Sequence, residues 1–358
     1  MTLIFSYISP ITGLFAVSDI LISRPKKDVP ISVSIPFREN PFEHSSRDYA
    51  LAGTSQKSVI FGRTMISFAD SVMVARAVIK YIREVSDDGQ IEINLEKTME
   101  DSGLSQKELD QVCLIYHFNP SGPSIVRTTW NCDKLDINGS NAVWAAGSGT
   151  QNFFENIITR LDDRIPDHEK VLQSFYSRLA SHPVSEMVGT DSLDHLYGGW
   201  FELTYRDEMS FTKVPYAVRF WARKSGTLAS GGPIHFGWYH GHDLNITRGQ
   251  ISEKDGSKSL MTSNFVVTDF LRRPSSVPAA WSIKPYFVIH VVFDEDNFGT
   301  AHILIQSDAD DGMKLEVTES GFRVGWTDAL RDKLLALGVS ANQIYTTPDV
   351  PRNGIKTE

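Results

Sequence analysis

The order of strand-like and helix-like segments predicts an α+β fold, a four-layer αββα sandwich of two antiparallel sheets flanked by helix pairs, with a C-terminal β-rich extension. Three observations predict it. Strand-like runs with a period of two come in groups, and helical runs come in pairs between these groups. From residue 197 onward almost all segments have the residue pattern of β-strands. Residues 1–205 are the predicted core, 206–345 a β-rich region that either completes the sandwich or extends it, and 346–358 a frayed tail.

The chain opens with MTLIFSYISPITGLFAVSD, which predicts a hairpin. Thr2 to Ile8 and Leu14 to Ile22 are β-rich runs, and the residues between them have the composition of a hairpin loop. A secretory signal is the weaker interpretation. No Lys or Arg precedes the apolar run, Pro10 and Gly13 interrupt it, and Asp19 stands where a small-residue cleavage site would be needed.

The next part of the chain predicts a long loop, two strands and two helices. Residues 23–55 are rich in Pro, Ser and Arg and are expected to form a surface excursion with one short strand. Lys57 to Phe68 gives two short strands, and Asp70 to Val85 has a broad apolar face at helical spacing. A second helix is predicted at Ser105 to Leu109, because a Glu follows its Ser cap by three residues.

The segments QVCLIYHFN, PSIVRTTW and SNAVWAAG predict three further strands. Gly147-Ser148-Gly149 ends the last of them and starts a helix through Leu161, and His168 to Val188 predicts another helix. The strands expected after Tyr197 are WFELTYRDE, YAVRFWARK, PIHFGWYHG, YFVIHVVFD, TAHILIQS and MKLEVTES, with a closing helix near Thr327 to Leu337.

Four positions in this order carry a resemblance to a known family. Thr2 becomes the first residue once Met1 is removed, Asp19 ends the first hairpin, Lys57 opens a strand leading to the first helix, and Ser148 lies in a Gly-Ser-Gly turn between strand and helix. Over about residues 2–205 the chain resembles the proteasome-type N-terminal nucleophile (Ntn) hydrolases, including bacterial proteasome-like protease subunits.

The resemblance implies an Ntn-hydrolase sandwich and a set of site residues. Thr2 would be the nucleophile, Asp19 would support Lys57, and Ser148 would be the family serine. The family also has an Asp and a Ser that bond the terminal amine. This chain reads GTDSLDHLYGGWFEL there, so the amine-supporting candidates are Asp191, Ser192 and Asp194, none of which aligns cleanly.

The chemistry explains why a site would use these residues. A threonine hydroxyl needs an adjacent base, and an N-terminal Thr2 supplies its own α-amine, whose unperturbed pKa is about 8. A nearby Lys57 ammonium would lower the pKa of both groups, and Asp19 would hold that ammonium charged and oriented. Backbone N–H groups at Gly147 and Gly149, at a helix N-terminus, would form the oxyanion site.

Other sites are weaker candidates, and we expect neither a metal nor a cofactor. His235, His240 and His242 place two histidines on one strand face, but no carboxylate or fourth ligand is fixed by their spacing. The acidic segments Asp294 to Asn297 and Asp308 to Gly312 lack calcium-loop spacing. A Ser-His-Asp hydrolase is not indicated, because no G-x-S-x-G element occurs.

Charge and cysteine usage limit the partners and the compartment. The net charge is −9 and no basic cluster is longer than Arg24 to Lys27, which argues against nucleic-acid and membrane-surface partners. No stretch of about 20 apolar residues occurs, so no transmembrane helix is expected. Two cysteines, Cys113 and Cys132, fit buried thiols in the cytoplasm, and a disulfide in an oxidising compartment stays an alternative.

These observations lead to two functional hypotheses. The first is a threonine-dependent amide hydrolase, a threonine protease or an enzyme of small amides, that uses Thr2 after Met1 removal. The alternative is a non-catalytic proteasome-like assembly or binding subunit. Under either hypothesis the resemblance implies a homo-oligomer, such as a ring.

Overall fold

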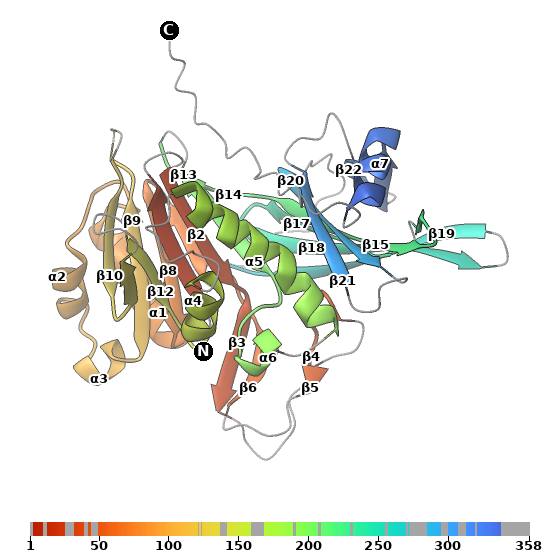
Figure 1. Cartoon of the computed structure of the whole chain (residues 1–358). Helices are drawn as coiled ribbons and strands as arrows, with labels where there is room; N and C mark the ends of the chain where they lie inside the picture. Colours follow the sequence, from red (N-terminus) through yellow and green to blue (C-terminus); the bar gives the residue numbers. More distant parts are fainter. Residues whose placement is uncertain are drawn as a thin grey trace, which may run out of the picture.

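The computed structural model describes residues 3–9, 13–25, 32–38, 42–43, 49–120, 122, 124–136, 142–158, 168–188, 191–206, 209–229, 232–254, 257–269, 271, 285–294, 300–306, 313–318 and 321–337 (Figure 1). The predicted tail 346–358 lies outside these residues.

The first sheet is built around the N-terminal hairpin. Strands β1 (Ile4–Ser9) and β2 (Gly13–Asp19) pair antiparallel, β12 (Ala142–Ala146) pairs with β1, and β13 (Phe201–Arg206) pairs with β2. The edge strands are β11 (Asp133–Asp136) and β14 (Phe211–Lys213). The predicted hairpin is therefore confirmed, and it occupies the middle of the sheet.

The second sheet has the order β10-β9-β8-β7. Its strands are β7 (Ser58–Phe61), β8 (Thr64–Asp70), β9 (Val112–Phe118) and β10 (Val126–Trp130). Helix α1 (Val72–Val85), whose N-cap is Ser71, packs its predicted apolar face on this sheet, together with α2 (Leu95–Glu100) and α3 (Gln106–Leu109). The capping box predicted for α3 is present.

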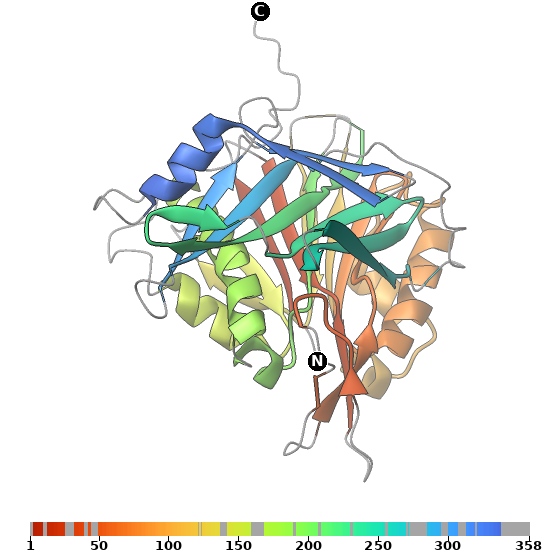
Figure 2. The same cartoon turned by 90° about the vertical axis from the view of Figure 1, so that its right-hand side faces the viewer.

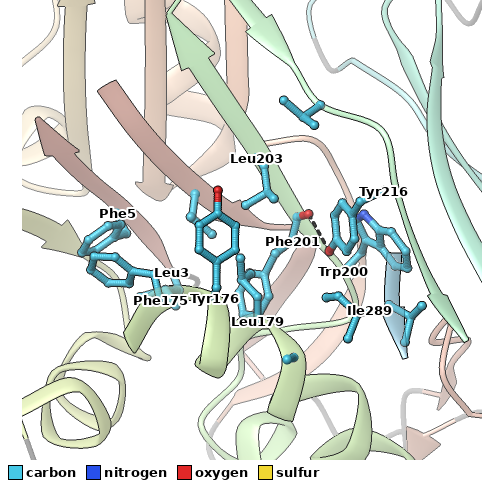
Figure 3. Packing of buried hydrophobic residues seen from close by; sticks show 14 of the residues in the cluster. Leu3, Phe5, Phe175, Tyr176, Leu179, Trp200, Phe201, Leu203, Tyr216 and Ile289 are labelled. Atoms are coloured by element: carbon cyan, nitrogen blue, oxygen red, sulfur yellow. Dashed lines mark hydrogen bonds between the residues drawn. The ribbon is translucent and has the colours of Figure 1, made fainter. Parts of the chain in front are cut away.

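Helices α4 (Thr150–Ile158) and α5 (His168–Val188) lie against the first sheet, followed by the one-turn α6 (Asp191–Asp194). The contact is aromatic. Phe175 of α5 lies 4.1 Å, centroid to centroid, from Phe5 of β1 (Figure 3). It also stacks on Phe15 of β2 at 5.5 Å. Burial of such rings removes a large apolar area from water, so this layer holds α5 firmly on the hairpin.

The C-terminal strands form a third large sheet of order β19-β18-β17-β15-β20-β21, with β16 (Thr227–Ala229) paired to β15. The strands are β15 (Tyr216–Lys224), β17 (Ile234–His240), β18 (Asp243–Lys254), β19 (Ser257–Val267), β20 (Phe287–Asp294) and β21 (Thr300–Gln306). β15 and β20 run parallel, whereas the other pairs of this sheet are antiparallel.

Small hairpins complete the described chain. They are β3 (Leu21–Pro25) with β6 (Tyr49–Thr54), β4 (Ser32–Val33) with β5 (Phe42–Glu43), and β22 (Met313–Thr318) with β23 (Gly321–Trp326), followed by α7 (Asp328–Ala336). The predicted excursion over 23–55 thus contains more strand than expected.

The predicted four-layer αββα sandwich is wrong. The described part of the chain is mostly β, with 49% strand and 23% helix. A third large sheet, which the predicted sandwich lacks, lies in front of the first sheet in Figure 2. It packs against α5 and the first sheet, so that one hydrophobic cluster includes Leu3, Phe175, Leu203 and Ile289 (Figure 3). On the other face α2 and α3 are 6 and 4 residues long, too short to form a layer of paired helices.

Among the described helices, none combines the length and the apolar character needed to cross a membrane.

Three buried histidines make the stability of the fold depend on pH. Burial lowers the pKa of His117 and His235 to about 3 and that of His290 to about 4. His290 is held as a neutral ring: Nδ1 accepts a hydrogen bond from Trp221 Nε1 at 3.1 Å, and Nε2 lies 3.0 Å from Gln306 Oε1. A second proton on this ring would break the bond to Trp221.

We predict that the free energy of unfolding falls as the pH drops from about 6.5 toward 4. The unfolded chain binds a proton at each histidine near pH 6.5, whereas the folded chain does not, so acid favours unfolding. His290→Gln should make this fall shallower by about 1 kcal/mol per pH unit, since one proton changes the slope by up to about 1.4. Urea denaturation at several pH values measures it, and an unchanged slope would contradict the prediction.

Candidate active site

Asp19 lies at the end of β2, and its fully buried carboxylate accepts four hydrogen bonds. Oδ1 accepts from the Leu3 backbone N–H at 2.9 Å and from Lys57 Nζ at 2.5 Å. Oδ2 accepts from the backbone N–H groups of Leu21 at 3.3 Å and Gly198 at 2.9 Å. A buried carboxylate is tolerated only when it is paired and hydrogen-bonded, and these donors meet that need.

Lys57 directly precedes β7, and its side chain is 1% exposed. Its ammonium donates to the Asp19 carboxylate and to the Leu21 carbonyl. Burial lowers the pKa of Lys57, and the nearby Asp19 charge opposes this effect. Because the effect of burial is the larger one, the pKa of Lys57 is below that of an ordinary exposed lysine, so Lys57 gives up its proton more readily.

Thr2, the predicted nucleophile, lies outside the described residues, which begin at Leu3. Leu3 is bonded to Thr2 and is held at both ends: its N–H donates to Asp19 Oδ1, and its carbonyl accepts from the Asp19 N–H at 3.0 Å. The Asp19–Lys57 pair is therefore located at the residue that follows Thr2 in the sequence.

The Gly-Ser-Gly turn lies at the same end of the first sheet. β1 pairs with β12 in a register that places Ile4 opposite Ala146, so the turn leaves the sheet beside Leu3. Gly147 has φ +106°, a conformation that favours glycine. Gly149 packs so closely on Tyr197 that a Cβ would lie 2.5 Å from a ring carbon. The hydroxyl of Ser148 donates to the His195 carbonyl at 2.8 Å, which ties the turn to the segment before β13.

The amine-supporting candidates fall on α6. The side chains of Asp191 and Ser192 lie outside the described part of the chain, and Asp194 is half-buried. The segment that does reach Asp19 follows α6: Gly198 donates to Asp19, and Gly199 donates its N–H to Glu186 Oε1 at 2.7 Å. Sequence reasoning missed this turn, although the Gly-Gly pair one residue before a strand was its signal.

Glu202, which sequence reasoning also missed, supports the site from β13. Its buried carboxylate accepts from the Lys57 backbone N–H at 3.0 Å, from the Ser18 hydroxyl at 3.2 Å and from Lys213 Nζ at 2.5 Å. Lys213 also donates to the side chain of Gln56 at 2.6 Å. This second ion pair fixes the backbone on which Lys57 stands.

No metal centre accompanies this site in the described residues, where no group of three or more His, Cys, Asp or Glu could hold an ion. His235 is buried in β17, His240 ends that strand, and His242 lies in the following turn. Of the two acidic segments, residues 295–297 and 308–312 lie outside the described chain.

Comparisons of the chain with protein-family models, with curated proteins and with solved structures found no match. The chemical capacity of the site is therefore argued from its geometry. It offers a buried amine with a lowered pKa, a carboxylate that orients it, and a turn with two glycines, Gly147 and Gly149, beside the start of β1.

We predict that Gly198→Ala lowers the free energy of unfolding by about 3 kcal/mol or more. Gly198 has φ +122°, and an added Cβ would overlap Glu186 Oε1 and lie 2.6 Å from His182 Cε1. Gly226→Ala is the matched control, because Gly226 also has a positive φ, +70°, but no atom lies within 4 Å of its added Cβ. The control should lose only about 1 kcal/mol of unfolding free energy, which is the cost of placing an alanine at a positive φ. Equal losses in urea denaturation would show that the close packing at Gly198 is unimportant.

Proposed function

We propose that this chain is a threonine-dependent amide hydrolase that acts on peptides or small amides as the N-terminal nucleophile hydrolases do. The observation that carries the proposal is the buried Asp19–Lys57 ion pair, which hydrogen-bonds the backbone N–H of Leu3, the residue after Thr2. A charged pair enclosed at the start of a strand is expensive to bury, and activation of a nucleophile is a reason to keep it there.

The reaction has two stages. The Thr2 hydroxyl oxygen forms a bond to the amide carbonyl carbon while its proton passes to the Thr2 α-amine. The carbon–nitrogen bond then breaks, and the leaving amine takes that proton. Water attacks the resulting ester, releases the acid and restores the Thr2 hydroxyl. Cleavage of the Met1–Thr2 bond is required, since only a free α-amine can act as the base.

The residues around Thr2 would contribute electrostatics and orientation. Lys57 would favour the alkoxide when charged and relay a proton when neutral, and Asp19 sets its direction. The N–H groups at Gly147 and Gly149 would stabilise the oxyanion at the start of α4. Ser148 would have a supporting role: its hydroxyl donates a hydrogen bond to the His195 carbonyl and so holds the Gly-Ser-Gly turn in place.

The alternative, a non-catalytic assembly or binding subunit, is favoured by one observation. The ammonium of Lys57 is 1% exposed and already satisfied by Asp19 and the Leu21 carbonyl, so the pair is stable without a nucleophile. The intact mass of the purified protein separates the two proposals, because a chain that retains Met1 has no threonine amine.

Assembly and compartment belong to the same proposal. We propose a homo-oligomer, which light scattering at micromolar concentration would distinguish from a monomer. We propose the cytoplasm as the compartment, because Cys113 and Cys132 are free thiols and a reducing compartment keeps thiols unpaired.

Thr2→Ala is expected to reduce amide hydrolysis to background without unfolding the protein. Thr2→Ser should keep a measurable fraction, because the hydroxyl and the α-amine both remain. Initial rates on a fluorogenic peptide and on a small amide, with circular dichroism as the control for folding, measure both effects. Full activity of Thr2→Ala would end the threonine mechanism.

Lys57→Arg should be nearly as damaging as Lys57→Ala, each lowering kcat by about 10²-fold or more. The compact ammonium fits a fully buried position beside Asp19, and a forked guanidinium does not. Lys97→Arg, at an exposed position of α2, is the matched control and should leave kcat unchanged. If Lys57→Arg is as active as the parent, Lys57 does not serve the reaction.

A further inference from the structure

Two buried carboxylates meet at one glycine pair. Gly198 N–H donates to Asp19, and Gly199 N–H donates to Glu186 near the end of α5. Glu186 is 0% exposed, and Nε2 of His182, one turn earlier on α5, lies 2.8 Å from its Oε1. Neither Glu186 nor His182 has a role in the proposed reaction, so their burial beside the site calls for a reason.

The turn depends on Glu186 for its geometry. Gly198 and Gly199 have φ +122° and +78°, and the Gly198 carbonyl accepts from the Ile20 N–H at 3.3 Å. Without Glu186, the buried N–H of Gly199 would lose its acceptor, a larger penalty than the loss of an ordinary exposed hydrogen bond. The turn would then relax, and the N–H of Gly198 would move away from Asp19.

Glu186 is itself held in place from two directions. Arg38 donates to the Glu186 carbonyl at 3.2 Å, which anchors the backbone at the end of α5. The His182 ring packs on Phe201, 4.4 Å between centroids, in the strand that follows the glycine pair. The carboxylate of Glu186 thus extends from α5 to the connector before β13, where the neighbouring Gly198 N–H donates to Asp19.

We infer that Glu186 is a positioning residue of this site: through the Gly198–Gly199 turn it fixes the orientation of the Asp19 carboxylate, and hence of Lys57. The inference rests on the proposed function for its effect on hydrolysis. Its structural half, that Glu186 holds the Gly198 N–H on Asp19, stands on the hydrogen bonds alone.

The test compares Glu186→Ala, Glu186→Gln and the control Glu155→Ala in the full chain. Glu155 is an exposed residue of α4 that also accepts a hydrogen bond from a side chain one turn away, Gln151, at 2.9 Å. The readouts are kcat and KM on the substrate used for Thr2→Ala, and hydrogen exchange of the Gly198 amide followed by NMR.

Glu186→Ala is expected to lower kcat at least 10-fold with KM within 2-fold, and to speed exchange of the Gly198 amide at least 10-fold while the amides of β8 and β9 keep their rates. Glu186→Gln retains an acceptor oxygen for Gly199, so kcat and exchange should both stay within about 3-fold of the parent. Glu155→Ala should change neither.

Two results would overturn the inference: unchanged exchange at Gly198 in Glu186→Ala, or a Glu186→Gln variant as impaired as Glu186→Ala, which would mean that the hydrogen bond to Gly199 is not what matters. Exchange is measured without substrate. If Thr2→Ala shows that the proposed hydrolysis is wrong, exchange at Gly198 still decides whether Glu186 holds the turn.

Discussion

The carboxylate of Asp19 is the constraint on which the candidate site depends. Its four donors come from Leu3, Leu21, Lys57 and Gly198, which stand at the start of β1, at the start of β3, before β7 and before β13. A buried carboxylate is stable only when its hydrogen-bond donors are all in place. Four separate segments of the chain must therefore come together around Asp19. The first sheet, the second sheet and the connector after α6 are thereby joined.

Opposing forces act on Lys57, and their balance gives the site its chemical character. Removal from water disfavours the ammonium, while Asp19 at 2.5 Å favours it, and burial has the larger effect on the pKa. A hydrogen bond from the Ser18 hydroxyl to the Glu202 carboxylate and a second ion pair, between Glu202 and Lys213, support the same backbone. The proposed role of Lys57 in proton transfer depends on this lowering of its pKa, which a fully solvated lysine would not have.

Local sequence patterns predicted the elements better than the architecture. The apolar face of α1, the capping box of α3 and the hairpin of β1 and β2 follow from short-range periodicity and side-chain chemistry, and all three are present. The predicted four-layer sandwich was wrong, because the pairing of β15 with β20 and the packing of the third sheet against α5 and the first sheet are long-range choices that no local pattern encodes. For the same reason Glu186, Gly198 and Glu202 were missed. Asp19 and Lys57 were found only because a family resemblance linked positions far apart in the sequence.

The parallel pairing of β15 with β20 also constrains the order in which the chain can assemble. β15 finds one neighbour, β17, soon after it is synthesised, but Tyr216 pairs on its other side with Phe287, after the β17, β18 and β19 meander has been made. Until then β15 exposes an unpaired edge, and contacts of such long sequence separation form slowly. A nascent chain that stops before residue 287 would thus have its N-terminal hairpin complete while one edge of β15 is still unpaired, and such an edge can pair with another chain.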